Sequence, residues 1–186
     1  MANRLFITSG ATFPFCELFE AILGSETILK ELVSTFHIRS IRVQYGSNAS
    51  SQLRFDSCTA TNMSLFNSLG ILVDGFPITK GFSAELAAST IVLSHAGAGT
   101  ILDTLRQEID PRPLLVVAAN PLLMHGHQSE LAIAMQDLGY LITVSELTTK
   151  GILDALHRLQ TATLVPFPPK ANISAIIDYE AGVLKL

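Results

Sequence analysis

The sequence predicts an α/β protein with a single Rossmann-like, doubly wound parallel sheet. Short apolar runs alternate with helical patterns along most of the chain. One of these runs, residues 90–94, breaks into a glycine-rich turn that opens a helix. The chain of 186 residues, 48% of them hydrophobic, is long enough for one well-buried domain. Strands that alternate with helices form parallel sheets, because the crossover helices cover both faces of the sheet.

The first part of the chain predicts two strands and two helices. Residues 4–9 form an apolar run typical of a buried strand, and two helical patterns, 15–23 and 26–36, follow it. Residues 38–45 alternate apolar and polar side chains, as a half-buried strand does. Residues 47–68 are rich in Ser, Asn and Thr with weak periodicity. We therefore expect a mobile excursion there rather than a regular element.

The middle of the chain repeats the alternation. We expect a strand at 70–74, a helix at 82–88 and a buried strand at 90–94. A helix follows the glycine-rich turn and extends to about Glu108, before Pro111-Arg112-Pro113 breaks it.

The remaining elements continue the same pattern. Residues 114–118 and 141–144 read as strands, and 128–138 and 147–159 as helices, with Gly139 as a stop signal. The helix at 128–138 would place three apolar side chains on one face: Leu131, Met135 and Leu138.

The proline-rich stretch that starts at Pro166 predicts the end of the compact part. We therefore expect one domain at 1–165 and a C-terminal segment at 166–186. This segment carries apolar residues and few charges, so it either packs on the body of the domain or docks on a partner.

Composition excludes several classes of function. The net charge is −4 and the 12 Lys and Arg residues do not cluster, which argues against a nucleic-acid partner. Two cysteines do not make a disulfide framework, so a reducing compartment is expected. The N-terminal apolar run is too short for a secretion signal, and no apolar stretch reaches about 18 residues.

Ligands of such sheets bind beyond the carboxyl ends of the strands, where three polar loops are expected. The first loop is Ser9-Gly10-Ala11-Thr12. Gly10 allows the backbone to approach a ligand, and Thr12 adds a hydroxyl. The alternative is a tight turn in which Thr12 caps the next helix.

The second loop, Ser94 to Thr100, presents free N–H groups and a positive helix end, which suits a diphosphate. The dinucleotide fingerprint lacks its third glycine, because Leu102 stands in its place, and no P-loop sequence exists. Asp103 could either complete a capping box with Thr100 or accept the two hydroxyls of a ribose. His95 could be a structural hydrogen-bonding group or a catalyst.

The third loop runs from Asn120 to Glu130. A metal pair at His125 and His127 has no third ligand at a suitable spacing, so we expect neither a metal nor a cofactor. His127, Gln128 and Glu130 are better suited to binding sugar hydroxyls. No Gly-x-Ser-x-Gly elbow or nucleophilic cysteine supports a hydrolase.

Together these motifs resemble the donor-binding half of two-Rossmann-domain (GT-B) glycosyltransferases, in the manner of a family 28 C-terminal domain. Within that group the chain is similar to the asparagine-linked glycosylation family, member thirteen, of UDP-N-acetylglucosamine transferase subunits. Four segments within residues 5–145 carry the resemblance. They are Phe6 to Thr12, Val43 to Gly46, Leu93 to Leu105 and Asn120 to Ala132.

The resemblance implies roles for individual residues. The diphosphate would lie against Gly97, Ala98, Gly99 and Thr100, with Gly10 and Thr12 on its other side. Asp103 would face the uridine ribose, although the family usually has Glu there. His127, Gln128 and Glu130 would face the GlcNAc, with Asn120 in the same loop. His95 is counted with these substrate-binding residues. The resemblance leaves the general base open between His95 and a partner, and it does not assign the uracil contact.

The resemblance also implies a reaction. GlcNAc would pass from UDP-GlcNAc to GlcNAc-diphospho-dolichol with inversion, as the second step of N-glycan precursor assembly. The acceptor domain would be a membrane-anchored partner chain, which would hold this cytoplasmic chain at the cytosolic face of the endoplasmic reticulum. Two alternatives stay open: a nucleotide-sugar-binding regulatory module without catalysis, and a UDP-sugar epimerase-like enzyme.

Overall fold

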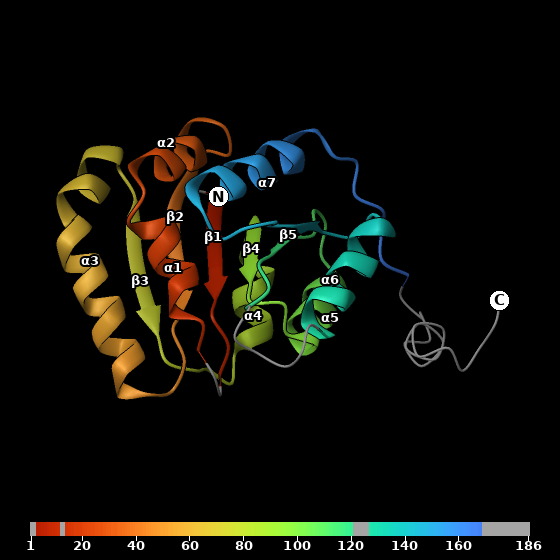
Figure 1. The fold of residues 1–186 in the computed structure, drawn as a ribbon, viewed down its shortest axis with the longest axis horizontal. Helices are drawn as coiled ribbons and strands as arrows, with labels where there is room; N and C mark the ends of the chain where they lie inside the picture. The colour runs from red at the N-terminus through yellow and green to blue at the C-terminus, as the bar shows by residue number, and fades with distance from the viewer. Residues whose placement is uncertain (1–2, 12–13, 121–126, 169–186) are drawn as a thin grey trace.

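The computed structural model describes residues 3–11, 14–120 and 127–168, and they form one six-stranded parallel sheet (Figure 1). The strand order is β3-β2-β1-β4-β5-β6, and every neighbouring pair is parallel. All carboxyl ends therefore share one edge, toward which the β1 and β3 arrows point at the bottom of Figure 1. This confirms the predicted fold class. The strands are β1 (Asn3–Thr8), β2 (Ile38–Gln44), β3 (Leu72–Phe76), β4 (Ile91–Ser94), β5 (Leu114–Val117) and β6 (Ile142–Thr143).

Helices cover both faces of the sheet, because alternate strand residues point to opposite sides. Leu5 and Ile7 pack in one core with helices α1 (Cys16–Leu23), α2 (Glu26–Ser34) and α7 (Thr149–Thr161). Phe6, between them, packs in a second core with the helices of the other face. Those helices are α4 (Phe82–Ala87), α5 (Ala98–Leu105) and α6 (His127–Asp137).

The expectation of a mobile excursion at 47–68 is wrong. These residues form α3 (Ala49–Leu69), a helix of 21 residues that lies at the β3 end of the sheet (Figure 1). The side chain of Asn48 caps its first turn by accepting from the Ser51 N–H at 2.7 Å. Gly70, with φ +65°, ends it in the left-handed conformation. Only Ser51, Phe55 and Phe66 are buried along this helix, so its hydrophobic periodicity is weak.

Most other boundaries differ from the predictions by one to three residues, and three of these differences are instructive. β3 starts at Leu72 rather than at Gly70, because Gly70 forms the C-cap of α3. α5 ends at Leu105, three residues before Glu108. On the helix α6, Met135 is buried as expected, but Leu138 lies beyond the end of the helix and is 49% exposed.

The strand order reverses between β1 and β4. From β1 the chain moves outward through β2 to β3, and then returns to place β4 on the other side of β1. The loops after β1 and β4 therefore lead to opposite faces of the sheet, and open α/β sheets bind their ligands at such a reversal of strand order. The topology thus selects the first and second predicted loops as the centre of the site.

Two further observations concern the ends of the described chain. Phe167, within the expected C-terminal segment, is buried and contacts Tyr140 edge to face at a ring separation of 5.0 Å. In the parts of the chain that the structure describes, no helix combines the length and apolar character needed to cross a membrane.

Candidate functional site

Two glycine loops meet at the point where the strand order reverses. Gly10 follows β1, and the turn from Ser94 to Thr100 connects β4 to α5. In the sheet, Thr8 at the end of β1 pairs with Ser94 at the end of β4. The first two predicted loops are therefore neighbours in space, as the sequence predicts.

The imidazole of His95 fills the space between the two loops. A Cβ atom on Gly10 would stand 3.2 Å from His95 Nε2, and a Cβ atom on Gly97 would stand 2.6 Å from the same nitrogen. Gly10 also has φ +98°, a conformation that side chains other than glycine rarely adopt. Gly97 has an ordinary extended φ of −67°, so at this position a side chain is opposed by the close approach of His95 rather than by the backbone conformation.

The helix α5 begins directly after Gly97, within the second predicted loop. Gly97 is the N-cap residue, and no side chain accepts a hydrogen bond from the first turn in the way a capping residue would. The first intrahelical hydrogen bond runs from the Ile101 N–H to the Gly97 carbonyl oxygen at 3.0 Å. The preceding N–H groups of the first turn have no acceptor within the helix and can bind an anion. Ala98 and Gly99 are exposed, and a Cβ on Gly99 would meet no atom within 4 Å.

The capping-box alternative for Asp103 is wrong, because α5 begins at Ala98 and places Thr100 inside the helix rather than at its cap. Asp103 lies in the second turn with an exposed side chain, where it is available to a ligand. The capping alternative for Thr12 also fails, because α1 has Phe15 as its N-cap. Thr12 itself lies outside the described residues.

Gly46 belongs to the site, although the sequence analysis treated it only as the end of a strand and part of a resemblance. It follows β2, has φ +92°, and a Cβ there would stand 2.3 Å from Pro14 and 3.0 Å from the Gly10 carbonyl oxygen. Loops after β1, β2 and β4 thus pack against one another through Gly46, Gly10 and His95. A glycine after each of three expected strands is the signal that could have revealed this arrangement.

Two buried side-chain oxygens at the carboxyl edge have no hydrogen-bond partner among the described residues. They are Gln44 Oε1 and Ser94 Oγ, on the two strands that flank Thr8. Buried polar atoms are nearly always hydrogen-bonded, so these two oxygens indicate a place where a water molecule or a ligand group completes the structure. The sequence analysis placed Ser94 at the start of the second loop and Gln44 in a segment that carries the resemblance, but it assigned neither side chain a role.

His95 is held by the end of β1. Its Nδ1 lies 3.3 Å from the carbonyl oxygen of Thr8, and its backbone N–H donates to the same oxygen at 3.3 Å. Burial lowers the pKa of His95, and the Thr8 contact only partly opposes that shift. The imidazole is therefore neutral near pH 7 in the protein without ligand.

The third predicted loop is described only in part. Asn120, after β5, is buried with 8% exposure, and Glu130, in the first turn of α6, is exposed. Residues 121–126 and the side chains of His127 and Gln128 lie outside the described part of the structure. The backbone of α6 begins at His127, which confirms that this cluster stands at a helix start after β5.

A cavity of about 570 Å³ opens beside the third loop, between α6 and the connection from β6 to α7. The ends of β5 and β6 form its floor, and the wall on α6 includes Ser129, Ala132 and Ile133. Its size and its mixture of apolar and hydroxyl-bearing walls suit a sugar-sized group.

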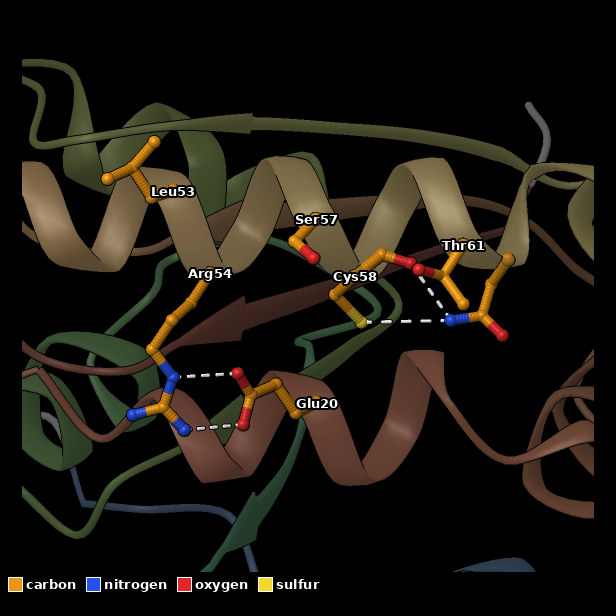
Figure 2. A pocket seen from close by; sticks show the side chains of 7 residues that line it. Glu20, Leu53, Arg54, Ser57, Cys58 and Thr61 are labelled. Carbon is orange, nitrogen blue, oxygen red and sulfur yellow. Dashed lines mark hydrogen bonds and ion pairs between the residues drawn. The ribbon is translucent and has the colours of Figure 1, made fainter.

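A second hollow, of about 380 Å³, lies between α1 and α3, and Figure 2 shows it. Arg54 donates to Glu20 at 2.7 Å and to Glu17 at 2.9 Å, so its charge is neutralised. Burial, with the charge of Glu20, raises the pKa of the Cys58 thiol, which keeps it protonated. None of the site residues predicted from the sequence lines this hollow.

Comparisons with known proteins identify the family. Residues 4–180 match the glycosyltransferase family 28 C-terminal domain. The chain belongs to this family. The UDP-N-acetylglucosamine transferase subunit ALG13 of Saccharomyces cerevisiae is 33% identical over 194 residues, with 92% of each protein covered.

Solved structures show the same fold. The solution structure of ALG13 matches with a TM-score of 0.68 and 29% identity over 92% of each chain. The crystal structure of MurG from Acinetobacter baumannii matches with a TM-score of 0.61 and 12% identity. The match covers 99% of this chain but 50% of MurG, so the single sheet corresponds in fold to half of that protein.

Proposed function

We propose that the chain is the donor-binding subunit of a transferase that moves GlcNAc from UDP-GlcNAc to GlcNAc-diphospho-dolichol. The product linkage would be β-1,4, formed with inversion in the second step of N-glycan precursor assembly. The name of the Saccharomyces relative supports the donor and the role as a subunit. The acceptor and the two-chain arrangement are the further part of the proposal.

The observation that carries the proposal is the meeting of two glycine loops at the ends of β1 and β4. There the ring of His95 lies between Gly10 and Gly97, and α5 begins directly after Gly97. This arrangement suits a diphosphate without a metal ion. The exposed carboxylate of Asp103 lies farther along the same helix, where it would accept the ribose hydroxyls.

The chemistry follows from this placement. The acceptor hydroxyl attacks the anomeric carbon while the bond to the diphosphate breaks, and negative charge accumulates on the departing UDP. The N–H groups from Ala98 to Thr100 would stabilise this charge, and removal of one such oriented donor typically lowers the rate by about 10²–10³. A general base must accept the proton of the hydroxyl.

A second chain would supply the acceptor side. GT-B enzymes of this type pair a donor domain with an acceptor domain, and the described residues form one sheet. A membrane-anchored partner would bring the lipid diphosphate to the carboxyl edge and hold this chain at the cytosolic face of the endoplasmic reticulum.

The decisive experiment measures transfer of radiolabelled GlcNAc from UDP-GlcNAc to a short-lipid GlcNAc diphosphate. We expect the purified chain to be almost inactive alone and to become active when membranes that contain the partner are added. The same membranes without the chain are the background control. Full activity without membranes would contradict the two-chain arrangement, and no gain over background would contradict the transferase assignment.

Gln128 tests whether the third loop binds the sugar. We expect Gln128→Ala to weaken UDP-GlcNAc about two- to tenfold, the range of one lost hydrogen bond, and to leave UDP nearly unaffected. Calorimetric titration with both ligands measures the difference. Asp103→Asn is the matched control, because loss of a ribose contact weakens both ligands alike. Equal weakening of both ligands by Gln128→Ala would show that this side chain does not bind the sugar.

A further inference from the structure

Four charged side chains form a cluster on the face of the sheet that α4 and α5 cover. They are Arg4 of β1, Arg42 of β2, Asp74 of β3 and Glu85 of α4. The carboxylate of Glu85 lies 3.0 Å from Arg4 and 3.2 Å from Arg42, and Arg42 also pairs with Asp74. Partly exposed ion pairs contribute little to the free energy of unfolding, so stability alone does not explain why three neighbouring strands carry this cluster.

Arg42 is also stacked on an aromatic ring. Its guanidinium lies over the ring of Phe76, the last residue of β3, at 4.7 Å from the ring centre. Phe76 is stacked on Phe6 of β1 at a ring separation of 6.1 Å, and Phe6 contacts Phe82, the first residue of α4, edge to face at 5.8 Å. Both ends of the loop 77–81 are therefore held by this layer of side chains.

The loop 77–81 belongs to the same row of loops at the carboxyl edge as the glycine loops. The N–H of Gly46 donates to the carbonyl oxygen of Pro77 at 3.0 Å. A Cβ on Gly46 would stand 3.0 Å from the carbonyl oxygen of Gly10, so these two glycines also lie against each other. A shift of the loop 77–81 would therefore reach the first glycine loop through Gly46.

The loop 77–81 also leads into the helix that packs beside the expected ribose contact. Gln107, just after α5, donates through Nε2 to Ser83 Oγ of α4 at 3.3 Å and to the carbonyl oxygen of Asp103 at 3.0 Å. In the proposed donor site the diphosphate lies at the start of α5 and the ribose at Asp103. The base of the nucleotide would then extend from the ribose toward α4 and this loop.

We propose that Arg42 is a positioning residue for the nucleoside end of the donor: through Phe76 it holds the loop 77–81 in the conformation that the bound nucleotide requires. This inference rests on the proposed donor site and adds a residue that does not itself touch the donor. An arginine suits this purpose, because a planar guanidinium can stack on a ring while its edge donates to Glu85 and Asp74. Without the stack the loop would spend part of its time in other conformations, and the apparent affinity would fall in proportion.

Calorimetric titration of Arg42→Met with UDP and with UDP-GlcNAc tests the inference. We expect both ligands to bind about five- to thirtyfold more weakly than to the parent protein, because both carry the same nucleoside. The titration is made at a temperature at which circular dichroism shows that both proteins are folded. Arg54→Met is the matched control, since it also removes an arginine that pairs with two carboxylates, but between α1 and α3. We expect the control to bind both ligands with parental affinity.

A double-variant cycle tests whether Arg42 acts through Phe76. Phe76→Leu removes the ring on which the guanidinium is stacked and should by itself weaken both ligands. When it is combined with Arg42→Met, the affinity should fall no more than about twofold below that of the weaker-binding single variant, because one substitution has already broken the contact. Losses that multiply would overturn the inference, since Arg42 would then affect the site by another route.

The remaining outcomes separate this inference from the proposed function. Parental affinity in a folded Arg42→Met protein would overturn the inference and leave the donor site intact, and so would an equal loss in Arg54→Met. If Arg42→Met does not fold, Arg42→Lys keeps a positive charge between Glu85 and Asp74 without the planar stack. It should still weaken both ligands, and parental affinity in that variant would overturn the inference. Failure of the parent protein to bind either ligand would overturn the proposed function and this inference together.

Discussion

Replacement of Gly97 by valine should abolish binding of UDP-GlcNAc and leave the fold in place. A Cβ at this position would stand 2.6 Å from Nε2 and 2.9 Å from Cε1 of His95, so the loop or the ring must move. Overpacking of this kind costs about 1–3 kcal/mol, and a displaced loop also loses charge-assisted hydrogen bonds to the diphosphate of about 1.5–3 kcal/mol each. The affinity should therefore fall by more than about 100-fold.

The measurement is calorimetric titration with UDP-GlcNAc, together with thermal unfolding followed by circular dichroism. Gly24→Val is the matched control. A Cβ on Gly24 would approach the Glu20 carbonyl oxygen to 2.9 Å, but Gly24 stands at the end of α1, away from the carboxyl edge of the sheet. It should lower the stability without changing the affinity. Parental affinity in a folded Gly97→Val protein would contradict the assignment of this loop to the diphosphate.

Replacement of Phe55 by alanine should lower the free energy of unfolding by about 3–5 kcal/mol. Phe55 anchors α3 to the rest of the protein: its ring lies 5.2 Å from that of Tyr45 and 5.9 Å from that of Phe19. It also contacts Gly75 of β3, where a Cβ would stand 2.6 Å from the ring. Such a loss is a large part of the roughly 5–15 kcal/mol that stabilises a typical domain.

Urea unfolding followed by circular dichroism measures this effect. The control is Leu53→Ala on the same helix, because Leu53 is 69% exposed and its removal should change the stability by no more than about 0.5 kcal/mol. Equal effects of the two substitutions would mean that α3 does not pack on the sheet through Phe55. The experiment therefore tests the element that the sequence analysis missed.

α3 could not be predicted from hydrophobic periodicity, for a physical reason. The helix lies at the edge of the sheet, and only Ser51, Phe55 and Phe66 are buried along its 21 residues. The other residues of the helix are half-buried or exposed, and many of them are Ser, Asn or Thr. The signals of its ends were present, however: Asn48 is a favourable N-cap and Gly70 a favourable left-handed C-cap.

The candidate site was also only partly predictable from the sequence. Gly10 and the turn from Ser94 to Thr100 were predictable, because a glycine-rich turn between a buried strand and a helix has a local sequence signature. The alternatives for Asp103 were not separable, because a capping residue and a ligand-binding residue can occupy the same sequence position. The start of α5 at Ala98 excluded the capping role, and the ribose contact of Asp103 stays a proposal.

The sequence alone determined the alternation of strands and helices, the parallel sheet and the loops that carry polar residues. These properties follow from periodicity and turn chemistry, which act over a few neighbouring residues. Only the tertiary structure decided how the loops meet. The reversal of strand order brings Gly10 and Gly97 to the same ring, that of His95, with hypothetical Cβ atoms at 3.2 Å and 2.6 Å from Nε2. Gly97 is a near neighbour of His95 in the chain, but the ring is held by Thr8, 87 positions away, and this contact is one that no local pattern encodes.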